Sequence, residues 1–176
     1  MPTEAELRPH RCCFTGHRPE KLGMSEDDVI ARLEKAILAA IQDGYTTFIS
    51  GMARGVDIWA AEIVLKLRDA GQPIKLICAS PFDGFESSWK SEWRTRFKTV
   101  IETADLTQFI CNNYSRTCFQ TRNEWMVDHS ARVIAVYNGQ SGGTQNTIVY
   151  ANRHSVDVKN VFEMNEELED YHDCKL

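Results

Sequence analysis

Short apolar runs alternate with longer amphipathic stretches along most of the chain. The short runs are bounded by Gly, Pro or polar residues and are typical of strands that are buried on both faces of a sheet. In the longer stretches, apolar residues recur every three or four positions, as in helices that bury one side. Strands are therefore expected at Arg11 to Thr15, Thr46 to Ser50, Ile74 to Ala79, Leu106 to Cys111 and Val133 to Tyr137, with Val156 to Glu163 as a candidate last strand.

Capping residues and glycines mark where the helices begin and end. Ser25 with Asp28 resembles a capping box, and Gly44 closes the helix that follows it. The remaining helices are expected at Asp57 to Ala70, Ser87 to Thr103, Phe119 to Ser130 and from the glycines at 142–143 through Asn152.

This alternation predicts a single α/β domain of the Rossmann-like, three-layer type, with a mostly parallel sheet between two layers of helices. No linker or repeat divides residues 1–176, and we place the core at about 11–163. The acidic segment 165–176 is expected at the surface. Strand-to-helix loops of a parallel sheet leave one edge, so the loops at 16–18, 51–57, 80–82 and 138–144 are expected to lie together.

The stretch Phe48 to Glu62 passes from a strand through two glycines into a helix. Gly51 and Gly55 allow tight turns and close approach of backbone N–H groups to a ligand, and the amino terminus of a helix attracts anions. Arg54 adds a planar set of donors suited to phosphate or carboxylate. The alternative is an ordinary strand-to-helix turn in which Asp57 caps the helix.

A second Gly-rich loop, from Asn138 to Thr144, leads from the fifth strand into a helix. Two such loops on one edge suit a ligand that carries phosphate groups. A histidine side chain normally has a pKa close to neutrality, so His17 is a candidate for acid–base chemistry, although a loop side chain bonded to backbone is the alternative, and no catalytic residue is assigned. The candidate ligand-binding residues are Gly16, His17, Arg18, Ser50, Gly51, Arg54, Gly55, Asp57, Arg122, Asn123, Asn138, Gly142, Gly143 and Thr144.

Composition narrows the set of partners. A formal net charge of -5 argues against nucleic acid, which normally binds to a broad basic face. Residues 1–6 have no signal-peptide pattern and no apolar run approaches the ~20 residues of a membrane span, so a cytoplasmic protein with no membrane partner is expected. The 6 cysteines include no Cys-x-x-Cys pair, so neither a metal site nor a redox motif is predicted.

Several short motifs resemble known families. Ser50-Gly51-Met52-Ala53-Arg54-Gly55-Val56-Asp57 resembles the Ser-Gly-Leu-Ala-Arg-Gly-Ile-Asp signature of the DNA-processing protein A family, which belongs to the SLOG superfamily of Rossmann-like domains; Ala61 stands where that family often has His. Thr15-Gly16-His17-Arg18-Pro19, Arg122-Asn123 and Gly142-Gly143-Thr144 resemble, in this order, the small bacterial YpsA-like branch of SLOG. The resemblance covers about residues 13–151 and implies a nucleotide-type ligand.

Arg122-Asn123-Glu124-Trp125-Met126 and Gly142-Gly143-Thr144 also resemble a diverged form of the LOG phosphoribohydrolase pattern. On this match Arg122 corresponds to the catalytic arginine of that family, whereas Thr147 stands where its catalytic Glu is expected. A threonine hydroxyl cannot serve as a general acid near neutral pH. Hydrolysis of an N-glycosidic bond would therefore need another carboxylate, such as Glu62 or Asp57.

The leading hypothesis is a sensor or regulatory protein that binds a small molecule, either a nucleotide or an ADP-ribose-like derivative. No cofactor is assigned. A nucleotide phosphoribohydrolase is the first alternative, and a single-stranded DNA binder is the second.

Large aromatic side chains suggest a further contact surface. Trp89, Trp93 and Phe97 follow one another at spacings of four within an expected helix, which favours a stripe that faces the core or another subunit; a platform for stacking a base is the alternative. With Trp125 they offer more aromatic surface than one small domain readily buries. A homodimer or higher oligomer is therefore expected.

Overall fold

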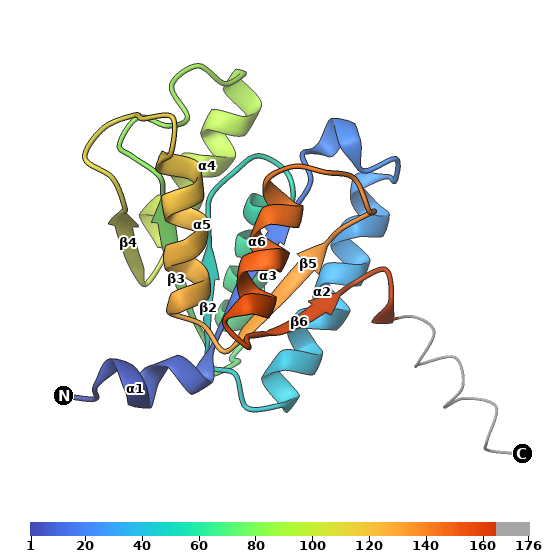
Figure 1. The fold of residues 1–176 in the computed structure, drawn as a ribbon, viewed down its shortest axis with the longest axis vertical. Helices are drawn as coiled ribbons and strands as arrows, with labels where there is room; N and C mark the ends of the chain where they lie inside the picture. Colours follow the sequence, from blue (N-terminus) through green and yellow to red (C-terminus); the bar gives the residue numbers. More distant parts are fainter. Residues whose placement is uncertain (165–176) are drawn as a thin grey trace, which may run out of the picture.

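The computed structural model describes residues 1–164 and contains one six-stranded sheet (Figure 1). All strand pairs are parallel, in the order β4-β3-β2-β1-β5-β6. The strands are β1 (Arg11–Gly16), β2 (Thr47–Ser50), β3 (Lys75–Ser80), β4 (Leu106–Phe109), β5 (Arg132–Val136) and β6 (Asp157–Asn160). The predicted α/β class with a Rossmann-like parallel sheet is confirmed. The expected surface segment 165–176 lies outside the described residues.

Helices cover both faces of this sheet and complete the three layers. Figure 1 shows α5 and α6 in front of the strands and α2 and α3 behind them. The longer helices are α2 (Glu26–Gln42), α3 (Val56–Asp69), α4 (Ser91–Thr103), α5 (Cys118–Asp128) and α6 (Gly143–Arg153). The short elements are α1 (Glu4–Leu7) and the 3-10 turns η1 (Arg8–His10) and η2 (Pro19–Lys21), which the sequence patterns did not predict.

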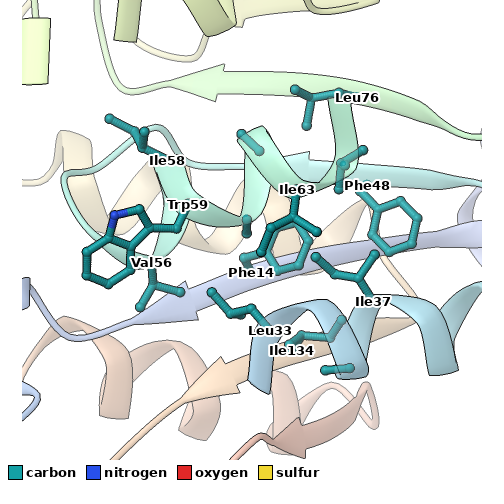
Figure 2. Close-up of a cluster of buried hydrophobic side chains, with 14 of the residues drawn as sticks. Phe14, Leu33, Ile37, Phe48, Val56, Ile58, Trp59, Ile63, Leu76 and Ile134 are labelled. Carbon is teal, nitrogen blue, oxygen red and sulfur yellow. The ribbon is translucent and has the colours of Figure 1, made fainter. Parts of the chain in front are cut away.

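Neighbouring residues of β1 point into different cores, because side chains alternate across a strand. Phe14 stacks on Phe48 of β2 with ring centroids 6.0 Å apart, and Leu33 of α2 packs in the same cluster (Figure 2). Cys13 instead belongs to a second cluster with Met126 of α5. Phe14, Phe48 and Cys13 are fully buried, so the central strands carry apolar side chains on both faces.

The first long helix begins as its sequence predicts. Ser25 is the N-cap of α2, where its Oγ accepts a hydrogen bond from the N–H of Asp28 at 3.2 Å and donates to the Asp28 carboxylate at 2.6 Å. Val29, Leu33 and Ile37 follow at helical spacing and are fully buried. Local capping and periodicity therefore agree with the packing of this helix.

One helix begins later than predicted. We expected a helix from Ser87, but α4 starts at Ser91, because the chain forms turns through 82–89 and Lys90 is extended (φ -59°, ψ 151°). Trp89 therefore precedes α4 and does not share a helical face with Trp93. The predicted last strand is also shorter, since turns follow β6 after Asn160.

The strand order places a switch point between β1 and β5. The chain adds β2, β3 and β4 on one side of β1, and then pairs β5 with the other side, in the register Gly16 to Val136. Loops that leave two such strands diverge toward opposite faces of the sheet and leave a crevice at the carboxyl ends of the strands. The loops with the candidate residues emerge at this edge.

Candidate functional site

A cavity of about 860 Å³ lies at the carboxyl edge of the sheet. Its lining comes from the loops after β1, β2, β3 and β5 and from the loop before α5 together with α5 itself. Most of the residues predicted from sequence line it, namely Gly16, His17, Arg18, Arg54, Asp57, Arg122, Asn123, Gly142, Gly143 and Thr144. Ser50, Gly51, Gly55 and Asn138 lie close by but outside the lining.

The loop between β2 and α3 is held by its own side chains. Ser50 Oγ donates to the carbonyl oxygen of Asp57 at 2.8 Å and accepts from the N–H of Met52 at 3.2 Å. The Asp57 carboxylate accepts from the N–H of Ala53 at 3.2 Å. Gly55, with φ 90°, is the N-cap of α3, so the expectation that Asp57 caps this helix is wrong. Asp57 lies inside the first turn and bonds back to the loop.

The two glycines of this loop make room for protein groups. A Cβ on Gly51 would lie 2.7 Å from Nη1 of Arg122 and 2.9 Å from Oδ2 of Asp57. A Cβ on Gly55 would lie 2.8 Å from Cδ of Pro19. The absence of a Cβ at these glycines therefore lets Arg122, Asp57 and Pro19 pack closely against the loop.

Arg122 and Asp57 are both buried beside the cavity. Arg122 donates from Nη1 to the carbonyl oxygen of Gly51 and from Nε to Oδ1 of Asn123 at 2.8 Å. Burial lowers the pKa of Arg122, and the charge of Asp57 acts in the opposite direction. Burial raises the pKa of Asp57, opposed by Arg122 and by the Ala53 N–H. The two opposite charges therefore compensate each other in a site with little access to water.

Arg54 pairs with Glu20 of η2, with 3.4 Å between Nη1 and Oε1. Arg18 and Lys21 also line the cavity and are exposed. The lining thus includes three cationic side chains from the loops after β1 and β2.

His17 lies at the end of β1 and is only 5% exposed. Within residues 1–164 its Nε2 is buried and has no hydrogen-bond partner, while its ring lies 5.5 Å from that of Tyr137. Burial lowers the pKa of His17, the charge of Lys21 adds to this effect, and a polar contact with Asn138 opposes it. His17 is therefore neutral near pH 7 and offers an unused ring nitrogen. Asn138 itself donates to the carbonyl oxygen of Lys21 at 2.9 Å.

The amino terminus of α6 meets the cavity at Gly142, Gly143 and Thr144. Gly142 is the N-cap, with φ 144°, and the described residues provide neither a capping side chain nor an acidic residue in the first turn. The first N–H groups of a helix have no partner within it and carry the positive end of its dipole. This terminus is therefore open to an anion, whereas α3 carries the acidic Asp57 in its first turn.

Sequence reasoning missed an aromatic wall on the opposite side of the cavity. We use this name for Phe82, Phe85, Trp89, Tyr114 and Phe119. Phe82 contacts both Tyr114 and Phe119, with ring centroids 5.9 and 6.4 Å apart, and Phe85 contacts Trp89 at 4.9 Å. The available signal was the position of the segment 81–90 directly after a predicted strand. Assigning its second half to a helix concealed it.

Two residues considered for hydrolysis lie outside the cavity lining. Thr147 is buried inside α6, where its Oγ1 donates to the carbonyl oxygen of Gly143 at 2.9 Å. Glu62 binds Arg96 of α4 through both oxygens, at 2.8 and 2.6 Å. Glu62 is thus held on α3 by an ion pair, and Asp57 is the one of the two proposed acids that lines the cavity.

The aromatic residues that suggested an oligomer have ring contacts within the chain. Trp93 lies 6.0 Å from Trp59, and Trp125 stacks on His129 at 4.0 Å. Trp89 contacts Phe97, which is buried. These side chains consequently provide no argument for a second subunit.

Residues 1–164 contain neither a membrane-spanning helix nor a cluster of metal ligands. In that part of the chain no helix is long and apolar enough to cross a membrane. The same residues contain no group of three or more His, Cys, Asp or Glu side chains arranged for a metal ion. The cysteines at 12, 13, 78, 111 and 118 are free thiols.

Among solved structures, DNA processing protein A from Helicobacter pylori has a similar fold. The TM-score is 0.60 at 18% sequence identity, and the match covers 93% of this chain and 73% of that one. That protein is described as binding single-stranded DNA. The expectation against a nucleic-acid partner therefore finds no support in this comparison.

Sequence relatives cover most of the chain. A UPF0398 protein of Bacillus thuringiensis (strain Al Hakam) is 27% identical over 154 residues, which are 83% of this chain and 84% of the relative. A UPF0398 protein of Bacillus cereus (strain B4264) is 26% identical over the same length. The family profile YpsA, described as the YspA SLOG family, matches residues 12–165. The resemblance of the three short motifs to SLOG thus extends over the whole fold, and the chain belongs to the YspA SLOG family.

Proposed function

We propose that this protein binds a nucleotide or a nucleotide derivative and holds its phosphate between the amino terminus of α6 and His17. One observation carries this proposal. The uncapped first turn of α6 lines the same cavity in the described chain as His17, whose buried Nε2 has no hydrogen-bond partner there. Membership in the SLOG family and likeness to a DNA-binding neighbour support a nucleotide-related or DNA-binding role in general.

A phosphate group would supply the hydrogen-bond acceptors that the amino terminus of α6 and His17 lack among the described residues. Backbone N–H groups at Gly143 and Thr144 can donate to phosphate oxygens, and the helix dipole favours the negative charge. A neutral His17 with its proton on Nε2 adds a further donor. An unpartnered buried polar atom costs about 1–3 kcal/mol, which a bound oxygen would offset. Arg18 and Arg54 supply positive charge beside it.

The small number of carboxylates in the cavity favours ligand binding without hydrolysis of the ligand. Among the described residues that line the cavity, Asp57 is the only Asp or Glu. Its carboxylate is buried and bonded to the N–H of Ala53. A general acid must reach the leaving group, and Asp57 is committed to its own loop. We therefore assign a sensing or regulatory role.

Calorimetric titration with AMP and with ADP-ribose tests the proposal. We expect binding to the wild type and about tenfold weaker binding to His17→Phe, because a hydrogen bond to a charged group contributes ~1.5–3 kcal/mol. His154→Phe is the matched control, since His154 lies just beyond the far end of α6. If the wild type and His17→Phe bind both nucleotides with equal affinity, the proposed phosphate site is wrong.

Single-stranded DNA is the second candidate function. It is favoured by the aromatic wall beside cationic side chains, a combination found in proteins that stack successive bases, and by the description of the structural neighbour. The net charge of -5 disfavours it. Fluorescence anisotropy with a labelled oligothymidylate at 50 and 200 mM salt, concentrations in the range where DNA binding depends steeply on salt, separates the two. Salt-sensitive binding of the oligonucleotide without binding of nucleotides would favour DNA.

A further inference from the structure

One ring of the aromatic wall, that of Tyr114, remains largely exposed although it contacts other members of the wall. We infer that Tyr114, supported by Phe82 and Phe119, stacks on the flat ring of the ligand, which is the base of a nucleotide. This inference rests on the proposed function and assigns the other end of the same ligand. The cavity then has one end for phosphate and another for the base.

Ring geometry within the wall leaves faces open. The ring pairs among Phe82, Phe85, Trp89, Tyr114 and Phe119 meet at interplanar angles between 55° and 77°. In such tilted and edge-to-face contacts, the edge of one ring meets the face of another and covers only part of it. Elsewhere in the molecule, Trp125 and His129 stack at 23° and cover each other. The rings of the aromatic wall thus do not stack on one another, and a flat ligand can stack on the free part of a ring face.

Tyr114 is the member of the wall with the largest free surface. It is 65% exposed, although it lines the cavity and contacts Phe82 and Phe119. These two neighbours are half-buried and hold the position of the Tyr114 ring. The exposed Tyr114 ring and the half-buried rings beside it form a contiguous aromatic surface in the cavity, and such surfaces mark binding sites for other molecules.

The base end and the phosphate end lie over different strands. Phe82 follows β3 and Tyr114 follows β4, whereas Gly142 to Thr144 follow β5. In the sheet order, β5 and β3 are three strand spacings apart, which is roughly 14 Å. Substitutions at the two ends should therefore act independently, because sites farther apart than about 10 Å are usually additive.

The test uses ligands with and without a base. AMP and ADP-ribose carry both a base and phosphate, while ribose 5-phosphate carries phosphate alone. We expect Tyr114→Ala to weaken binding of AMP and ADP-ribose by roughly tenfold or more, because stacking on an aromatic side chain contributes strongly for each base. Affinity for ribose 5-phosphate should stay unchanged. Tyr114→Phe should retain wild-type affinity because it keeps the ring.

Matched variants isolate the effect. Phe109→Ala removes an exposed aromatic ring outside the cavity lining and should change no affinity. In the double variant His17→Phe with Tyr114→Ala, the two fold-losses for AMP should multiply. The base site is supported if Tyr114→Ala weakens AMP binding, Phe109→Ala does not, and the losses multiply in the double variant.

Failure of the base site differs from failure of the proposed function. If the wild type binds AMP but Tyr114→Ala binds it equally well, or loses ribose 5-phosphate to the same extent, the base site is overturned and the phosphate site stands. If the wild type binds none of the three ligands, both are overturned. If Tyr114→Ala weakens only an oligothymidylate, the wall serves single-stranded DNA and the nucleotide assignment is wrong.

Discussion

Arg122 of α5 donates a hydrogen bond from Nη1 to the carbonyl oxygen of Gly51, directly after β2. The bond joins the layer that carries α5 to the loop that leads into α3 on the other face of the sheet. Beside it lies the carboxylate of Asp57, whose buried charge the guanidinium compensates. The residue that resembles a catalytic arginine therefore connects two layers of the fold.

Loss of this arginine should destabilise the protein. Arg122→Met leaves the Asp57 carboxylate buried without its positive neighbour, and breaking a buried charge pair in this way costs about 3–5 kcal/mol. Urea unfolding followed by circular dichroism measures the change. Arg116→Met is the control, because Arg116 is exposed. Equal unfolding free energies for both variants would show that Arg122 contributes no compensation.

Neutral His17 predicts a specific pH dependence of stability. Its pKa in the fold is lower than the ordinary 6.5, so the unfolded chain binds more protons as the pH falls below that value. The free energy of unfolding should therefore decrease between about pH 6.5 and pH 5, and should be restored above pH 6.5. His17→Gln removes the titrating group and should flatten this part of the curve. Denaturant unfolding at several pH values gives both curves, and parallel curves would contradict the assignment.

Gly55 and Gly139 separate the effect of backbone conformation from that of close packing. Their φ angles are 90° and 91°, but only Gly55 lies against Pro19, whereas a Cβ on Gly139 would meet nothing within 4 Å. An alanine at positive φ is strained in either position, at a cost on the order of 1–3 kcal/mol. Gly55→Ala should lose more, because its Cβ would also displace Pro19. Thermal unfolding of the two variants tests this, and equal losses would mean that the contact is easily relieved.

We expect no release of free base from AMP or ADP-ribose. Positioned acid catalysis contributes roughly 10²–10⁴ in rate, and the described cavity lining contains no carboxylate free to supply it. Chromatographic detection of adenine over several hours measures the reaction. Efficient release by the wild type that is lost in Asp57→Asn would instead identify an enzyme.

The parts of the fold that depend on local sequence were predictable. Ser25 caps α2, and the buried runs around Phe14 and Ile134 become neighbouring central strands, because capping and periodicity are properties of short segments. Most of the candidate residues taken from the family motifs also line the cavity, including His17 and Gly142. The shared edge of a parallel sheet explains why residues so far apart in sequence meet there.

Contacts between distant segments were not predictable from these patterns. The spacing of Trp89, Trp93 and Phe97 suggested one helical face, but Trp89 precedes the helix and belongs to the aromatic wall. Asp57 has the ordinary position of a residue near a helix start, yet its environment is set by Arg122 from the opposite layer. Tertiary packing decides both cases, and helical periodicity carries no information about it.

The switch point between β1 and β5 also constrains the order of folding. Strands β1 to β4 add to one another in sequence, but the register of Gly16 with Val136 closes a loop that spans most of the chain. Loop closure of this length is slow, since its entropic cost precedes the contacts that compensate it. His17 and the amino terminus of α6 can meet only after that closure. Ligand binding during refolding would therefore follow the last long-range step, and a nascent chain that ends after α5 but before β5 would contain the residues of the aromatic wall without the phosphate end of the cavity.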